Sequence, residues 1–189
     1  MANYEPAYRA VMSAEGGYSN RAVDRGGETY CGISRKYYPH WVGWGIVDQY
    51  PLPNKHGIDK DPKLPALVQS FYKSEYWDKF QGDKIRSQTI AEELFDTGVN
   101  MGLGAAVKFL QRALNVLNRR GKLYPDLEID GGMGPTTLSS LNTMQEERLL
   151  FKIMNILQGS HYVDIMLDDE TQEDNARGWF NRVSIEKIA

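Results

Sequence analysis

Apolar side chains recur at the spacing of an α-helix in the first segment of the chain. Pro6 suits the first turn of a helix, and Gly16 and Gly17 interrupt the pattern. The spacing therefore predicts a first helix that ends near Glu15. Its apolar stripe contains Tyr4, Ala7, Tyr8, Val11 and Met12.

The same helical spacing returns in the middle and in the second half of the chain. Asp61 followed by Pro62 is a start signal for a helix, and Ser87 is another, while Gly102 and Gly104 interrupt the pattern. The helices predicted in this way cover about residues 62–80, 87–101 and 106–117, a short segment from residue 135, and roughly 145–166.

Strand signals are few and weak. Residues 18–33 are polar and glycine-rich, which predicts a small β-hairpin or an ordered loop. Ser34 is a candidate cap for a short helix that Pro39 ends, and residues 40–60 have the composition of a long irregular loop. The chain is therefore predicted to be mainly α-helical.

Charge and composition exclude several partners. The chain has 25 acidic and 22 basic residues without long runs of either sign, which is not the basic footprint of a nucleic-acid-binding protein. No stretch reaches the ~18 apolar residues of a membrane span, and the start lacks the basic and apolar regions of a classical export signal. We expect no nucleic acid partner, no membrane insertion, and synthesis without a classical signal peptide.

The sequence has too few cysteines and histidines for a disulfide framework or a paired set of metal ligands. Cys31 is the sole cysteine of the sequence, so no intramolecular disulfide can form. His40, His56 and Cys31 do not show the paired spacing of metal ligands. The sequence predicts neither a metal site nor a cofactor.

Glu15 is the next member of the first apolar stripe, so its carboxyl group faces the core side of the helix. It also lies in the last turn, where the helix dipole is negative. Desolvation and the dipole both disfavour the ionised form and raise the pKa of this carboxyl group. Such a glutamic acid stays protonated near neutral pH and can donate its proton to a leaving glycosidic oxygen. The alternative is a solvated glutamate at a frayed helix end.

The residues around Glu15 resemble a known family. The segment from Glu15 to Tyr18 reads EGGY, and residues 24–33 read D-x-G-G-x-T-x-x-G-I. This pattern resembles the signature of glycoside hydrolase family 108, in which a glutamate ends the first helix and a hairpin follows. The spacing is also similar to the Glu, Asp, Thr arrangement of phage-type lysozymes. The resemblance implies a lysozyme-like helical fold in which Glu15, Asp24 and Thr29 converge as catalytic residues.

Asp24 and Thr29 suit the remaining tasks of glycoside hydrolysis. The reaction needs a second polar group that stabilises positive charge or orients water. Asp24, in a polar and glycine-rich segment, stays ionised for the first task, and Thr29 would hold the water. A turn residue at Asp24 and an ordinary strand residue at Thr29 are the alternatives. Glu28 is a rival second carboxylate.

Four further residues are candidates for substrate binding. Tyr18, Asn20 and Tyr30 would border a sugar cleft through stacking and amide hydrogen bonds, although core packing explains Tyr18 equally well. Asn100 lies four residues after Asp96 on one predicted helix face. It either reaches the cleft or caps a neighbouring helix.

The second half of the chain resembles a predicted peptidoglycan-binding domain. The segment from Asp130 to Thr136 is similar to the D-G-x-x-G-P-x-T turn of such domains, and residues 178–183 resemble their end. A simple connector between helices explains the turn equally well. The predicted division is a catalytic region at 1–95 and a peptidoglycan-binding region at 96–189, which either fold separately or share one core.

The resemblance implies an enzyme that hydrolyses the β-1,4 bond between N-acetylmuramic acid and N-acetylglucosamine by an inverting course, with Glu15 as general acid. A lytic transglycosylase would use the same Glu15 without an ordered water. A non-catalytic peptidoglycan-binding or secretion-accessory protein would keep only the fold. The expected partner is the glycan strand, and a monomer is the expected state. The expected site of action is the cell wall, reached through a holin during phage lysis or in bacterial wall remodelling.

Overall fold

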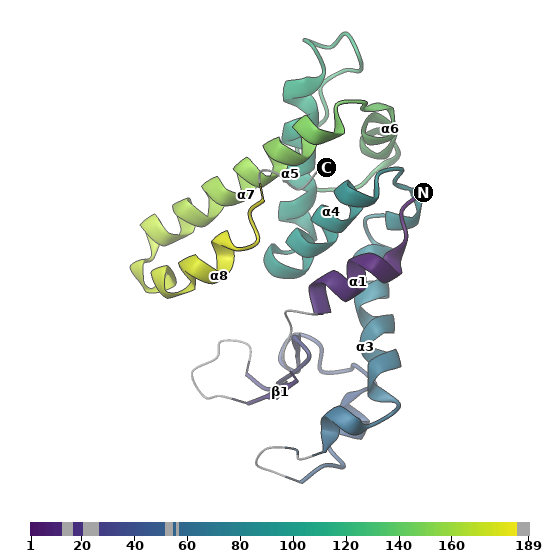
Figure 1. The fold of residues 1–189 in the computed structure, drawn as a ribbon, viewed down its shortest axis with the longest axis vertical. Coiled ribbons are helices and arrows are strands. Elements are labelled where there is room, and N and C mark those ends of the chain that lie inside the picture. The colour runs from purple at the N-terminus through teal and green to yellow at the C-terminus, as the bar shows by residue number, and fades with distance from the viewer. Residues whose placement is uncertain (13–16, 21–26, 52–54, 56, 185–189) are drawn as a thin grey trace. The chain divides into compact units, whose positions relative to one another are not determined.

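A computed structural model describes residues 1–12, 17–20, 27–51, 55 and 57–184 (Figure 1). Glu15 and Asp24 therefore lie outside the described residues. The chain divides into two compact units, one formed by Tyr4–Asp78 and the other by Met1–Asn3 together with Lys79–Ala189.

The Tyr4–Asp78 unit combines helices with a small sheet. Helix α1 is the predicted first helix and is described to Met12, so its predicted end near Glu15 stays a prediction. Helix α3 continues directly into a π-helical segment, η2. The elements are α1 (Tyr4–Met12), β1 (Tyr18–Ser19), β2 (Thr29–Tyr30), β3 (Ile33–Ser34), α2 (Trp44–Val47), η1 (Ile58–Lys60), α3 (Leu64–Tyr72) and η2 (Lys73–Trp77).

The core of this unit forms where α1 packs on α3 and η2. The Tyr4 ring lies 5.6 Å from the Trp77 ring, and the Tyr8 ring lies 6.2 Å from the Tyr72 ring, between centroids. The Tyr4 hydroxyl donates to the backbone carbonyl of Gln69 at 2.8 Å. Aromatic rings at helical spacing thus give α1 a large buried face, as its apolar stripe predicts.

The three strands form an antiparallel sheet in the order β1-β2-β3. Cys31 and Gly32 connect β2 to β3, and their φ angles of 46° and 77° are both positive. Two central residues with positive φ are typical of a type I′ turn, whose twist matches that of a two-strand hairpin. The predicted small hairpin within residues 18–33 is confirmed, and so is the mainly helical fold class.

The predicted short helix at Ser34 is wrong. Ser34 is the last residue of β3, where it pairs with Thr29, and residues 35–37 form a turn. The serine side chain is buried in the sheet, so it is not placed to cap a helix. Pairing with the neighbouring strand β2 has overridden the cap signal.

A one-turn helix, α2, lies within residues 40–60, which were predicted to be an irregular loop. The Trp44 ring is buried, and its indole nitrogen donates to the backbone carbonyl of Tyr38 at 2.8 Å. The Arg35 guanidinium lies 4.4 Å from the centroid of the same ring. These contacts place α2, and none of them follows from residue spacing along the chain.

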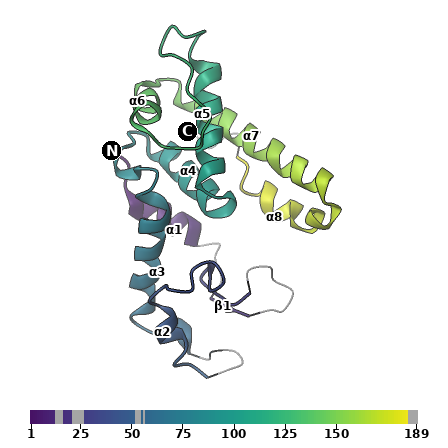
Figure 2. The ribbon, with the colours of Figure 1, turned by 180° about the vertical axis from the view of Figure 1, so that it is seen from behind.

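The second unit is a cluster of longer helices. Figure 1 shows α4, α5 and α7 together, and Figure 2 shows α6 beside α5 from behind. The Ser87 hydroxyl caps α4 by accepting from the backbone N–H of Ile90 at 3.1 Å, which confirms that start signal. The elements are η3 (Gly82–Lys84), α4 (Gln88–Met101), α5 (Leu103–Leu117), α6 (Pro135–Thr143), α7 (Glu147–Asp168), η4 (Glu170–Asn175) and α8 (Ala176–Phe180).

The apolar stripes of α4, α5 and α7 make the core of this unit. They are amphipathic helices that bury large aliphatic and aromatic side chains against one another. The predicted boundary at residue 95 lies within α4, and the division into 1–95 and 96–189 stays a prediction. In the described part of the chain, no helix combines the length and apolar character needed to cross a membrane. The fully buried core side chains include Ile90, Leu94, Phe95, Leu110 and Phe151.

The turn after residue 130 is held by Gln111, a buried residue of α5. The Gln111 side-chain amide donates to the carboxylate of Asp130 at 2.7 Å and to the carbonyl of Gly132 at 3.1 Å. Its carbonyl accepts from the backbone N–H of Gly131 at 2.9 Å. Gly131 has a φ of 79°, and a Cβ there would lie 2.9 Å from the Gly104 carbonyl oxygen, so the turn requires glycine.

The C-terminal helix α8 packs along α7, as the yellow and green ribbons of Figure 1 show. The Trp179 ring stacks on the buried Tyr162 ring at 4.9 Å between centroids. Beyond α8, Arg182 forms a 2.6 Å ion pair with Asp96 of α4. The end of the described chain is thereby fastened to the helix cluster.

Candidate active site

The hairpin carries four of the residues that the sequence singles out. Tyr18 lies on β1, Asn20 is an exposed residue just beyond it, and Thr29 and Tyr30 form β2. Tyr18 pairs across the sheet with Tyr30, whereas Thr29 pairs with Ser19. Because neighbouring residues of a strand point to opposite faces, the two tyrosines share one face and Thr29 lies on the other.

Glu28 is held by two side chains. The Tyr18 hydroxyl donates to its Oε1 at 3.0 Å, and the Arg35 Nε lies 2.7 Å from its Oε2. The ion pair is about three-quarters buried, with side-chain exposures of 31% for Arg35 and 21% for Glu28. Burial and the hydrogen bond to Glu28 raise the pKa of Tyr18. Both carboxylate oxygens of Glu28 therefore have partners that maintain the hairpin.

Arg35 extends this contact into a network that the sequence did not indicate. Its guanidinium donates to both carboxylate oxygens of Asp48, at 2.6 and 3.2 Å. The pKa of Asp48 is lowered, mainly by this hydrogen bonding. Lys55, a buried residue, places its ammonium 4.0 Å from Asp48 and 5.8 Å from the centre of the Tyr18 ring. The resulting charge network runs from Glu28 through Arg35 and Asp48 to Lys55 and holds the face of the hairpin that carries Tyr18.

Tyr30 is a packed residue. Only 4% of it is exposed, and its ring stacks on Trp41 with 6.2 Å between centroids and 19° between planes. Burial is the main cause of its raised pKa. The adjoining turn is tied down by Tyr72, whose hydroxyl donates to the Cys31 carbonyl at 2.8 Å. The proposed contact of Tyr30 with a sugar stays a prediction.

A carboxylate that the sequence did not single out lies beside the EGGY motif. A Cβ atom on Gly17 would come within 2.6 Å of the Asp59 Oδ1, so a side chain at position 17 would press on this carboxylate. Close approach by Asp59 explains the second glycine of the motif.

Asn100 lies in the other unit, on α4. Its side-chain amide donates to the Tyr162 hydroxyl of α7 at 2.5 Å. Its neighbour on the helix face, Asp96, forms an ion pair with Arg182. The Asn100 amide thus joins α4 to α7, and its contact with substrate stays a prediction.

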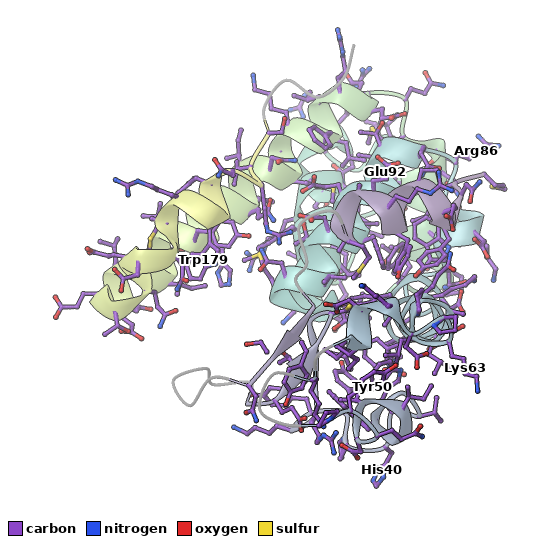
Figure 3. All side chains as sticks on the ribbon, turned by 60° about the horizontal axis from the view of Figure 1, so that its bottom comes forward. His40, Tyr50, Lys63, Arg86, Glu92 and Trp179 are labelled. Atoms are coloured by element: carbon purple, nitrogen blue, oxygen red, sulfur yellow. The ribbon has the colours of Figure 1, made fainter. Side chains whose placement is uncertain are left out.

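Over the part of the chain that the structure describes, no group of three His, Cys, Asp or Glu side chains is arranged to hold a metal ion. Cys31 is half-buried, and His56 lies outside the described residues. His40 lies on the loop before α2, where Figure 3 labels it.

A mainly helical chain with a short antiparallel hairpin after its first helix has the architecture expected of a lysozyme-like protein. The Glycosyl hydrolase 108 family model matches residues 8–102, about half of the chain. The protein belongs to this family. A second family model, described as Predicted Peptidoglycan domain, matches residues 105–184. Together the two matches support a glycoside hydrolase that acts on peptidoglycan.

The fold has a solved counterpart. The structure of SagA from Brucella abortus is similar with a TM-score of 0.63 and 23% sequence identity, covering 95% of this chain and 88% of that chain. At this identity the likeness shows the fold alone. A comparison with curated proteins gave no match.

Proposed function

We propose that the protein is an N-acetylmuramidase that hydrolyses the β-1,4 bond between N-acetylmuramic acid and N-acetylglucosamine. One observation carries the proposal. The antiparallel hairpin that bears Thr29 begins at Tyr18, the last residue of the EGGY segment, in a chain that belongs to the Glycosyl hydrolase 108 family. The reaction needs one carboxyl group to protonate the leaving oxygen and a second polar group to act at the anomeric carbon, and the proposal assigns these tasks to the EGGY glutamate and to residues 24–29.

The proposed roles follow from the surroundings of each group. Glu15, which the sequence predicts to lie in the last turn of the first helix on its core side, is the general acid. Asp24 is the ionised carboxylate that stabilises the oxocarbenium-like transition state, and Thr29 orients water for an inverting attack. The two contacts of Glu28 favour Asp24 as the stabilising carboxylate, because both oxygens of Glu28 already bind Arg35 and Tyr18 within the hairpin.

We further propose that the second unit holds glycan strands. The family match over residues 105–184 supports this role. No described side chain contact identifies the binding face, so the proposal concerns the unit as a whole. Action on the cell wall, after release from the compartment of synthesis, is part of the same proposal.

The test is clearing of purified peptidoglycan by the wild type and by Glu15→Gln. The substitution should lower turnover by ~10²–10⁴-fold, the usual share of general acid catalysis. Glu92→Gln is the matched control, since its carboxylate contacts only Gln88 among the hydrogen bonds described for it, at 2.9 Å on α4. Retained activity in a folded Glu15→Gln variant would refute the assignment.

Mass analysis of the products identifies the reaction. Hydrolysis adds one water and leaves a reducing N-acetylmuramic acid end, whereas a transglycosylase leaves an anhydro end. A product without the added water would replace the muramidase proposal with the transglycosylase. Absence of any product from wild type would favour the non-catalytic alternative.

A further inference from the structure

A pocket of about 460 Å³ lies within the Tyr4–Asp78 unit, apart from the sheet residues of the proposed active site. Its volume falls in the ~300–1,000 Å³ range of small-molecule sites. One wall is the loop before α2, where Figure 3 labels His40, and the other wall is the end of α3 with the start of η2. The lining residues that matter here are Tyr37, Tyr38, His40, Trp41, Phe71 and Glu75.

The aromatic walls support one another. Tyr38 meets Phe71 edge to face at 4.7 Å between centroids, and Trp41 meets Phe71 at 6.3 Å. The Trp41 ring lies close against Gly43, where a Cβ would come within 2.2 Å of it. These contacts fix the rings before any ligand arrives, which reduces the ordering cost of binding.

The rim of the pocket exposes apolar surface. Tyr37 is 64% exposed and Val42 is 70% exposed. The far wall includes Ser74 and Glu75 of the π-helical segment, a rare geometry that is frequent at functional sites. Exposed aromatic surface bordered by polar groups is typical of binding sites on soluble domains.

The lining chemistry selects the ligand. Among the described residues that line the pocket there is no lysine or arginine, and Glu75 contributes a carboxylate. An anion such as a lactyl or peptide carboxylate would find no charge complement there. The flat apolar face of a neutral sugar ring can pack on the aromatic rings, while tyrosine and serine hydroxyls and the His40 imidazole serve its polar substituents.

We propose that this pocket is an accessory subsite for a neutral N-acetylglucosamine unit of the glycan strand. This choice of ligand rests on the proposed function. The pocket adjoins the hairpin through Trp41, whose ring stacks on Tyr30 of β2. A sugar held there is therefore coupled by one aromatic contact to the strand that carries Thr29, without taking part in bond cleavage.

The experiment is a titration of the full-length protein with tri-N-acetylchitotriose, a neutral oligomer of N-acetylglucosamine. The readout is the indole N–H resonance of Trp41, assigned with Trp41→Phe. Val42→Arg narrows the rim of the pocket and should lower the affinity for chitotriose at least about tenfold. Tyr37→Ala should lower this affinity about threefold to tenfold, as expected for loss of one aromatic contact. Val116→Arg is the matched control, because Val116 is also 70% exposed but lies on α5.

The two proposals fail separately, because the titration does not measure turnover. The subsite is supported if the Trp41 shift saturates both in wild type and in Glu15→Gln, and if Val42→Arg weakens binding while Val116→Arg does not. A Trp41 resonance that does not respond, or responds equally in Val42→Arg, overturns it. Tighter binding by the wild type of an anionic muramic acid oligomer than of chitotriose would overturn the choice of a neutral sugar.

Discussion

Replacing Gln111 with leucine should destabilise the helical unit far more than the same change at Gln158. Both glutamines are 1% exposed, so the two substitutions remove amides from equally buried sites. Leucine is close to glutamine in size, which limits the change in packing. The difference between the variants therefore reports on hydrogen bonding.

The expected magnitudes follow from the partners of each amide. Gln111 has contacts of 2.7 to 3.1 Å with Asp130, Gly131 and Gly132, one of them to a carboxylate. Asp130 is solvent-exposed, so its bond is screened by water and counts as an ordinary one. Three hydrogen bonds of about 1 kcal/mol each predict that Gln111→Leu lowers the free energy of unfolding by about 2–4 kcal/mol.

Gln158 is poorly satisfied by comparison. Its amide nitrogen has only long contacts, 3.3 Å to the Thr97 hydroxyl and 3.4 Å to the Tyr162 hydroxyl. Its carbonyl oxygen is buried and has no hydrogen-bond partner within the described residues. Removing such a group relieves a desolvation penalty, so Gln158→Leu should change stability by no more than about 1 kcal/mol in either direction.

Urea denaturation followed by circular dichroism measures both changes, and thermal melting should show a loss of roughly 5–15 °C for Gln111→Leu. Unchanged m-values would show that the variants unfold in the same manner as wild type. Equal destabilisation by the two substitutions would refute the reasoning, because it would mean that shape at the buried site, rather than the set of hydrogen bonds, governs stability.

Three further outcomes are expected. Asp24→Asn should depress turnover strongly, whereas Glu28→Gln should mainly lower the melting temperature of the hairpin unit, and the reverse result would make Glu28 the second carboxylate. Hydrogen bonds from Gln111 and Gly132 lower the pKa of Asp130, so its contribution to stability is complete above the unfolded value of about 4 and is lost as pH falls through the lower folded pKa. Asp130→Asn should remove that acid-side loss from urea midpoints measured between pH 5 and 2. A fragment of residues 79–189 should show cooperative unfolding and pellet with insoluble peptidoglycan. A fragment that begins at residue 96 divides α4 and should not fold. Failure of a folded 79–189 fragment to pellet would contradict wall binding.

The sequence predicted the long helices because their order depends on local information. The apolar stripes of α4, α5 and α7 are set by side chains three and four residues apart, and the Ser87 cap acts within one turn. The hairpin could also be predicted, because glycine-rich polar segments indicate turns. Its I′ geometry at Cys31 and Gly32 was not, because Cys31 has no special preference for positive φ.

The candidate site was predicted only in part. The EGGY motif indicates Glu15 by resemblance, but no local pattern indicates that Asp59 lies against Gly17 or that Arg35 joins Glu28 to Asp48. These contacts link segments 7 to 42 residues apart through loops with little periodicity. Only the folded loops decide which carboxylates are paired, so spacing alone left Asp24 and Glu28 as rivals.

The turn at Asp130 has a consequence for how wall affinity should be sought. Its carboxylate, the backbone N–H of Gly131 and the carbonyl of Gly132 are all engaged by Gln111. The first two residues of the motif, Asp130 and Gly131, thus already have hydrogen-bond partners within the protein. A descendant selected only to stay folded would retain them after losing all affinity for glycan. Mutagenesis aimed at adhesion belongs on the exposed side chains around the turn, where change leaves the scaffold intact.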